Sequence, residues 1–281
     1  MPTTLVTAAE LAQHLNDPDW IVVDCRHQLN DAEWGETSYR QGHVPGARFL
    51  HLDRDLSAPL TGRNGRHPLP DPARLAQRLR EIGLNADSQL VVYDQVGGGM
   101  AGRLWWLARW LGHSRVALLD GGFGAWTAAA QPLEQTLPTP APGNFAGSPQ
   151  AGWTVTADEL LSRLEQPGLC LVDARAADRF AGENETLDPV GGHIPGARNR
   201  PWMNNLGADG CFKPAAQLRE EWLAVLAGSS AADSIQQCGS GVTACHNLLA
   251  LEVAGLTGAK LYPGSWSEWC SDPTRPVATG A

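Results

Sequence analysis

Short apolar runs alternate with longer amphipathic segments along the whole chain. The runs are continuous and rich in Val, Ile and Leu, as is typical of strands buried on both faces of a sheet. They lie at 21–23, 90–93, 169–172 and, more weakly, 234–237. Apolar residues at helical spacing lie at 71–83, 102–111 and 244–254. This alternation predicts an α/β fold, in which a mainly parallel sheet carries helices on both faces.

The same sequence patterns occur twice, in the same order. Val-Val-Asp-Cys-Arg at 22–26 returns as Leu-Val-Asp-Ala-Arg at 171–175, and Gly-His-Val-Pro-Gly-Ala-Arg at 42–48 returns at 192–198 with Ile for Val. A third pair matches 118–126 with 261–269. A repeat this long is a duplicated domain, since solenoid repeats are far shorter. Prolines crowd the stretch between the copies. We therefore expect domains at 1–135 and 153–281, joined by a Pro-rich linker at 136–152.

Composition and charge limit the classes of partner. Apolar residues make up 43% of the 281 residues, which is enough for a sizeable core, and the net charge is −9 with no basic run. Nucleic acids and anionic membranes are bound through clustered cations, so neither is expected as a partner. No apolar stretch is long enough to span a membrane, and residues 1–10 show a capping box of Thr7 and Glu10 rather than an export signal. We expect a cytoplasmic protein.

One of the six cysteines stands in an unusual context. The cysteines form no CxxC pairs, which disfavours a disulfide scaffold or structural zinc, so most of them, Cys245 included, are expected in the core. Cys238 instead follows the run 234–237 and precedes a helix, with Gly239-Ser240-Gly241 between them. A curled loop at a helix start aims backbone N–H groups inward and stabilises a thiolate. Cys238 is therefore the candidate nucleophile, although an inert cysteine in a glycine-rich turn is the alternative.

The chain resembles the rhodanese family of tandem-domain sulfurtransferases. The resemblance spans most of the chain and rests on these residues: Tyr39 with 43–47, the echo at 193–197, the loop 238–244, and Gly-Ser-Trp-Ser-Glu-Trp at 264–269. It implies two rhodanese-like domains, of which the first is catalytically silent. Asp94 takes the place of Cys238 there, and an aspartate cannot accept sulfur. Residues present in both copies, Arg26 with Arg175 and His43 with His193, are expected to be structural.

The resemblance also implies roles for the residues around Cys238. Thiosulfate-preferring members carry Arg and Lys after the cysteine, whereas Gly239-Ser240 looks like the mercaptopyruvate-preferring type. In that type Ser240, His67 and Asp53 would form a proton relay for the enolate that sulfur loss leaves behind. Substrate would be bound by the loop and by arginine; the implied residues are Arg179, Gly239, Gly241, Val242 and Thr243. Such members usually have a second arginine about ten residues after the first, but 183–192 has none and is acidic. Arg103 or Arg198 could replace it.

The sequence thus predicts a sulfurtransferase that needs no metal or organic cofactor. Sulfur would pass from 3-mercaptopyruvate through a Cys238 persulfide to a thiol, thioredoxin or cyanide. The alternatives are a thiosulfate:cyanide sulfurtransferase and a persulfide-relay module that takes sulfur from a partner protein. A cysteine phosphatase is disfavoured because such enzymes need an arginine six positions after the cysteine, where this chain has Ala244.

Overall fold

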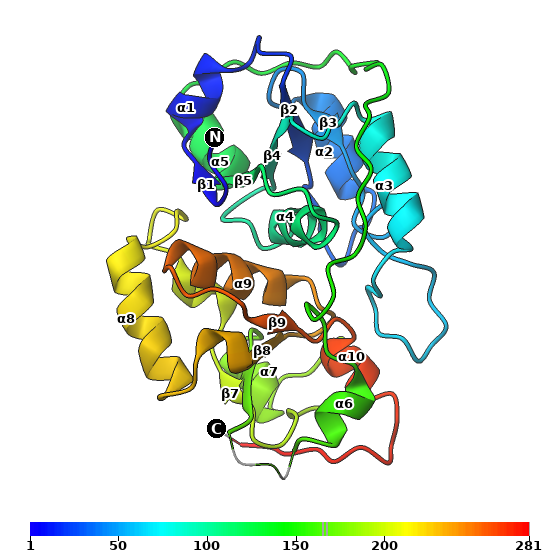
Figure 1. Ribbon diagram of the computed structural model, residues 1–281, viewed down its shortest axis with the longest axis vertical. Helices are drawn as coiled ribbons and strands as arrows, with labels where there is room; N and C mark the ends of the chain where they lie inside the picture. Colours follow the sequence, from blue (N-terminus) through cyan, green and yellow to red (C-terminus); the bar gives the residue numbers. More distant parts are fainter. Residues whose placement is uncertain (165, 167, 281) are drawn as a thin grey trace. The chain divides into compact units, whose positions relative to one another are not determined.

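The computed structural model describes residues 1–164, 166 and 168–280, and it divides the chain into two compact α/β units (Figure 1). The first unit comprises 1–58, 70–150 and 207–212, and the second comprises 59–69, 151–206 and 213–281. Residues 165, 167 and 281 of the predicted domain 153–281 lie outside the described residues. The predicted boundaries stay a prediction, because each unit takes one short segment from within the sequence range of the other.

The sheet of the first unit has five parallel strands in the order β1-β5-β4-β2-β3. The central strand β4 and its neighbour β2 are fully buried, and Val22 is paired with Val91. The strands are β1 (Leu5–Val6), β2 (Trp20–Asp24), β3 (Arg48–Phe49), β4 (Gln89–Tyr93) and β5 (Val116–Leu119). The helices are α1 (Ala8–Gln13), α2 (Trp34–Gln41), α3 (Pro72–Glu81), α4 (Ala101–Trp110) and α5 (Gly122–Ala128). The predicted Thr7–Glu10 capping box begins α1.

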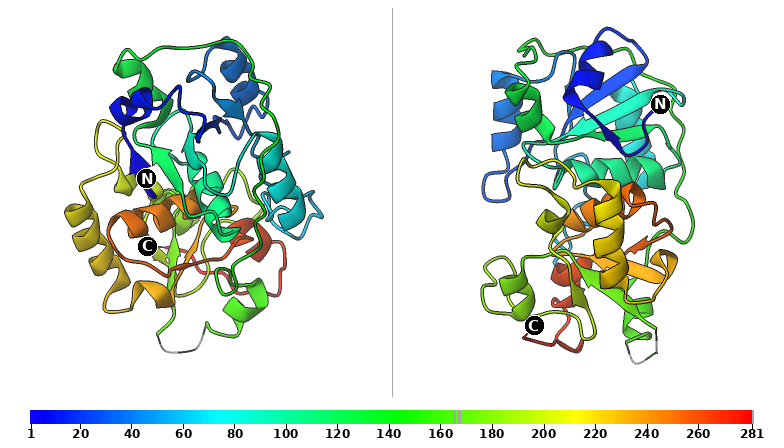
Figure 2. Two further views of the ribbon diagram at one scale, coloured as in Figure 1. Left: turned by 45° about the horizontal axis from the view of Figure 1, so that its top comes forward. Right: turned by 90° about the vertical axis from the view of Figure 1, so that its left-hand side faces the viewer.

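The second unit repeats this plan with a four-stranded parallel sheet in the order β7-β6-β8-β9 (Figure 2). Its strands are β6 (Cys170–Asp173), β7 (Arg198–Asn199), β8 (Ser234–Gln237) and β9 (Lys260–Leu261). Its α-helices are α6 (Ala157–Leu161), α7 (Ala177–Ala181), α8 (Ala215–Leu226), α9 (Thr243–Val253) and α10 (Ser265–Trp269), with short 3-10 turns η1 (Trp202–Asn205) and η2 (Ala231–Asp233). The two sheets confirm the predicted α/β fold.

The repeated Asp-x-Arg motif builds the same buried ion pair in both units, as expected of structural residues. Arg26 Nη2 lies 2.7 Å from the Asp24 carboxylate, and Arg175 Nη2 lies 2.7 Å from that of Asp173. Each arginine also donates to a glycine carbonyl that precedes the repeated histidine. The histidines bind backbone carbonyls: His43 Nδ1 lies 2.7 Å from an oxygen in α2, and His193 Nδ1 lies 2.9 Å from one in α7.

The proline-rich stretch packs on the first unit instead of standing free. Gly143 donates its N–H to the Arg80 carbonyl at 2.8 Å, and Phe145 donates to the Leu84 carbonyl at 3.1 Å. These bonds tie the stretch to α3 and to the turn after it, and the long trace follows α3 in Figure 1. Within the described residues, no helix has both the length and the apolar character needed to cross a membrane.

Candidate active site

Cys238 stands at the carboxyl end of β8, one turn before α9. The Gly241 N–H donates to Cys238 Sγ at 3.1 Å, and the cysteine is 2% exposed. Gly241 has φ +77°, and a Cβ at this position would lie 2.2 Å from the Pro263 carbonyl oxygen. Only glycine allows the loop to turn this tightly and aim its N–H at the sulfur. Val242 then caps α9, whose first residue is Thr243.

The start of α10 braces the loop from behind. The Trp266 N–H donates to the Cys238 carbonyl at 3.0 Å, and the Ser267 N–H donates to the Gly239 carbonyl at 2.9 Å. Ser265 Oγ accepts the N–H of Cys238 itself at 3.1 Å. Ser265 adopts φ +52°, a left-handed conformation that is unfavourable for a residue with a Cβ. The nucleophile's backbone is thus held by a strained residue.

The first unit shows what the equivalent loop does to an anion. Asp94 follows β4 as Cys238 follows β8, and its carboxylate accepts four backbone N–H bonds of 2.7–3.1 Å. The donors are Val96, Gly98, Met100 and Ala101. Burial raises the pKa of Asp94, and these four bonds oppose the rise. The loop that follows the central strand in this fold can therefore encircle negative charge.

The structure brings together two of the three predicted relay residues. His67 Nδ1 lies 2.7 Å from Ser240 Oγ, and both side chains are buried. His67 comes from the segment 59–69, which belongs to the second unit and in which the Arg66 N–H donates to Ser267 Oγ at 3.0 Å. Asp53 belongs to the first unit and has a side chain that is 44% exposed. Its place in the relay stays a prediction.

Three arginines and three buried carboxylates surround the loop. Arg179 Nη2 lies 2.8 Å from Glu185 and 3.5 Å from Asp188, and Arg66 forms an ion pair with Asp188. Arg175 Nη1 lies 3.5 Å from Glu185. Burial lowers the pKa of Arg175, but the charges of Asp173, Glu185 and Cys238 outweigh it and raise that pKa above its usual value. Arg175 therefore stays charged and places a cation in the electrostatic surroundings of Cys238.

The acidic stretch 183–192 lacks the expected second arginine, but it supplies the carboxylates that pair with Arg179 and Arg66. Sequence reasoning took its carboxylates as a departure from the expected pattern and overlooked Arg66, although Arg66 stands directly before His67. Arg198 Nη1 donates to the carbonyls of Val225 and Leu226 at 2.7 Å, and its place as the second arginine stays a prediction. Arg103 is fully buried in α4 of the first unit, and its role in substrate binding stays a prediction.

One group of side chains has metal-ligand composition but not the chemistry to bind a metal. His27, His51 and Asp53 offer ligand atoms within 4.8 Å of one another. However, His51 Nδ1 accepts the Asp53 N–H at 3.0 Å, and His51 Nε2 lies 3.0 Å from the Ala32 carbonyl, to which it must donate. Neither ring nitrogen of His51 keeps a lone pair for a metal.

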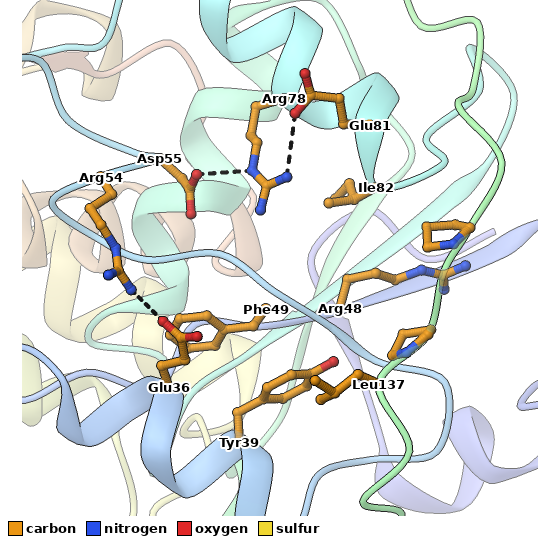
Figure 3. Close-up of a pocket in the computed structure, with 12 residues that line it drawn as sticks. Glu36, Tyr39, Arg48, Phe49, Arg54, Asp55, Arg78, Glu81, Ile82 and Leu137 are labelled. Atoms are coloured by element: carbon orange, nitrogen blue, oxygen red, sulfur yellow. Dashed lines mark hydrogen bonds and ion pairs between the residues drawn. The ribbon is translucent and has the colours of Figure 1, made fainter.

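A cavity of about 430 Å³ in the first unit is lined by paired charges (Figure 3). Arg54 lies 2.5 Å from Glu36, and Arg78 lies 2.9 Å from Asp55 and 3.4 Å from Glu81. The cavity is lined by Glu36, Tyr39, Arg48, Phe49, Arg54, Asp55, Arg78, Glu81, Ile82, Leu137, Pro138 and Pro140. None of the predicted site residues lines it.

Comparison with known proteins matches the chain twice to one domain family. The model of the rhodanese-like domain matches residues 7–129 and 156–272. A Pseudomonas aeruginosa protein named as a probable 3-mercaptopyruvate sulfurtransferase is 52% identical over 278 residues, which are 98% of each chain. Bovine thiosulfate sulfurtransferase is 34% identical over 253 residues, which are 85% of this chain and 83% of that protein.

A solved structure supports the same assignment. The 3-mercaptopyruvate sulfurtransferase from Leishmania major superimposes with a TM-score of 0.85 at 32% identity, and the match covers 95% of this chain and 74% of that one. Each of the two domain matches covers one copy of the repeat, including its strand-end loop. The chain therefore belongs to the rhodanese family and carries two rhodanese-like domains.

Proposed function

We propose that the protein is a sulfurtransferase that moves sulfur from 3-mercaptopyruvate to a thiophilic acceptor through a persulfide on Cys238. The observation that carries this proposal is the placement of Cys238 Sγ, which accepts the Gly241 N–H at 3.1 Å beside the charge of Arg175. A hydrogen-bond donor and a nearby cation both favour the thiolate, which is the reactive form of cysteine. The family membership supports sulfur as the transferred group.

In the first half-reaction, the Cys238 thiolate attacks the thiol sulfur of the donor. An S–S bond forms, the donor's C–S bond breaks, and its electron pair stays on carbon as the enolate of pyruvate. A proton delivered to that carbon completes pyruvate and leaves Cys238 as a persulfide. The His67–Ser240 pair, 2.7 Å apart, is the proposed proton source. Asp53 is proposed as the third relay member.

In the second half-reaction, an acceptor attacks the outer sulfur of the persulfide. The S–S bond breaks, its electron pair returns to Cys238 as the thiolate, and the acceptor leaves with the sulfur. A small thiol, thioredoxin or cyanide can serve in this step. Gly239, Gly241, Val242 and Thr243 are proposed to surround the transferred sulfur, as the Asp94 loop surrounds its carboxylate in the first unit.

The donor preference is argued from the His67–Ser240 contact. Sulfite, which leaves when thiosulfate is the donor, needs no proton on carbon, whereas the enolate from mercaptopyruvate does. A buried serine–histidine pair beside the nucleophile therefore has a function only when 3-mercaptopyruvate is the donor. Arg179 is proposed to bind the donor carboxylate, and Arg103 is a further candidate from the sequence.

We further propose a cytoplasmic location. All six cysteines are free thiols, of which five are buried. Free cysteines in this number are usual where the compartment keeps thiols reduced.

The ratio of catalytic efficiencies for 3-mercaptopyruvate and thiosulfate tests the proposal. We expect pyruvate release with a thiol acceptor to exceed sulfite release from thiosulfate, and Cys238→Ser to abolish both. A preference for thiosulfate would assign the protein to the thiosulfate type. Turnover of neither donor unless a persulfide-bearing partner protein is added would make it a relay module.

A further inference from the structure

We infer that Arg66 is the second arginine of the donor-binding site and, together with Arg179, binds the donor's carboxylate above Gly239. This inference rests on the proposed function for the identity of the donor. It supplies a residue that the resemblance to the family would place elsewhere, in the stretch 183–192.

Two guanidinium groups meet at the glycine next to the nucleophile. A Cβ at Gly239 would lie 2.8 Å from Arg66 Nη2 and 3.7 Å from Arg179 Nη1. Any side chain at this position would displace Arg66, so the glycine keeps the space beside Cys238 open. Both arginines are partly exposed, at 27% and 20% of their side chains, so a solute can reach them.

Each of the two arginines keeps one terminal nitrogen that is not hydrogen-bonded within the described residues. Arg66 Nη1 donates to Asp188, and Arg179 donates from Nε and Nη2 to Glu185 and from Nη2 to Asp188. Arg66 Nη2 and Arg179 Nη1 make no hydrogen bond to any residue that the structure describes. Two unused donors on neighbouring guanidinium groups match the two oxygens of a carboxylate.

The remaining contacts hold both arginines in place. The side chains of Glu185 and Asp188 are each 3% exposed, and their carboxylates form ion pairs with the two guanidinium groups. The Arg66 backbone is fixed by its N–H bond to Ser267 Oγ at 3.0 Å. Prearranged donors lose little conformational entropy when a ligand binds. The arrangement therefore suits recognition of a small carboxylate, of which a 2-oxo acid with a thiol at carbon 3 is the proposed example.

A pair of alkylating agents tests carboxylate recognition without assuming any donor. Iodoacetate and iodoacetamide both react with the Cys238 thiolate, which displaces iodide and forms a thioether, but only iodoacetate carries a carboxylate. We expect the rate with iodoacetate divided by the rate with iodoacetamide to fall about tenfold in Arg66→Gln, as the loss of a charge-assisted hydrogen bond predicts. The control is Arg63→Gln, the same substitution at an exposed position of the same segment, which should leave the ratio unchanged.

Steady-state kinetics then link the site to the donor. Arg66→Gln should raise KM for 3-mercaptopyruvate about 10- to 100-fold with a smaller change in kcat, and Arg66→Lys, which keeps the charge but not the fork, should recover part of the loss. Thermal unfolding of each variant shows whether the substitution acts through folding instead. Should Arg66→Gln not fold, Arg66→Lys carries the same comparison.

The two proposals fail separately. A wild-type-like alkylation ratio and KM in folded Arg66 variants would overturn the role of Arg66 and leave the sulfurtransferase intact. A lowered ratio in a protein that does not turn over 3-mercaptopyruvate would support the carboxylate site and overturn the proposed donor.

Discussion

The Gly241 N–H donates a hydrogen bond to Cys238 Sγ at 3.1 Å, and the backbone that makes this possible is open only to glycine. We expect Gly241→Ala to lower the sulfur-transfer rate at least 100-fold, because the Cβ would collide with the Pro263 carbonyl and move the donor away from the sulfur. The measurement is the rate of sulfur transfer together with the rate of alkylation of Cys238 by iodoacetamide.

Gly228→Ala is the matched control, because Gly228 also has a positive φ, +88°, but its Cβ would meet nothing within 4 Å. That variant should lose about 1 kcal/mol of stability and keep its rate. Equal sulfur-transfer and alkylation rates for Gly241→Ala and the wild type would show that this hydrogen bond does not affect the reactivity of Cys238.

Ser265 binds the backbone of the nucleophile at the cost of a left-handed conformation. The equivalent position of the first unit is Gly122, with φ +60°. We expect Ser265→Ala to lower the free energy of unfolding by about 2 kcal/mol, because the buried N–H of Cys238 loses its acceptor. Ser265→Gly loses the same acceptor but relieves about 1 kcal/mol of backbone strain. Urea unfolding should therefore rank the glycine variant above the alanine variant; the reverse order would contradict the strain.

The His67–Ser240 pair should matter for one donor only. Ser240→Ala removes the proton donor for the enolate, so we expect kcat with 3-mercaptopyruvate to fall about 100-fold while turnover of thiosulfate changes little. Ser162→Ala, at the exposed serine that directly follows α6, is the control. Equal losses with both donors would mean that Ser240 shapes the loop and does not relay protons.

Glu221 makes the stability of the second unit depend on pH. Burial raises the pKa of Glu221, but hydrogen bonds from Arg200, Lys213 and Gln217 outweigh it and hold that pKa at about 2. Since the folded pKa lies below the unfolded one, the network stabilises the protein above about pH 4.5 and loses this effect as the pH falls toward 2. The side chain is 26% exposed, so screening by solvent limits the contribution to about 1 kcal/mol.

Glu221→Gln should therefore be less stable than the wild type by about 1 kcal/mol near neutral pH, and the difference should shrink as the pH falls below about 4.5. Urea titrations at several pH values measure this difference. Glu220→Gln, its exposed neighbour, should show no such trend, and a constant difference for Glu221→Gln would refute the assignment.

The elements that depend on local pattern are predictable from the sequence. The buried run 234–237 coincides with β8, and the predicted helix 102–111 is α4 displaced by one residue. Burial on both faces leaves a strand such as β4, whose residues 90–93 are Leu-Val-Val-Tyr, continuously apolar, so its position needs no long-range information. The strand β8 has the sequence Ser-Ile-Gln-Gln, which is why its pattern was weaker. The repeat then placed Asp94 and Cys238 at equivalent strand ends.

Features that depend on contacts between distant segments escaped prediction. Arg66 becomes part of the site only because the segment 59–69 joins the second unit, and no local pattern signals that exchange. The acidic stretch 183–192 appeared unfavourable for an anionic donor, whereas Glu185 and Asp188 hold the arginines in place. The effect of these carboxylates on the site depends on the arginines with which they pair, and the sequence alone does not show those pairs.

The most direct test of the account is the mass of the protein after incubation with 3-mercaptopyruvate in the absence of an acceptor. We expect the wild-type protein to gain one sulfur atom, located by peptide mapping on Cys238, and a thiol acceptor to remove it. The Cys238→Ser variant should gain none. A Cys238→Ser protein that still acquires the sulfur, or a wild-type adduct on another cysteine, would contradict Cys238 as the sulfur carrier.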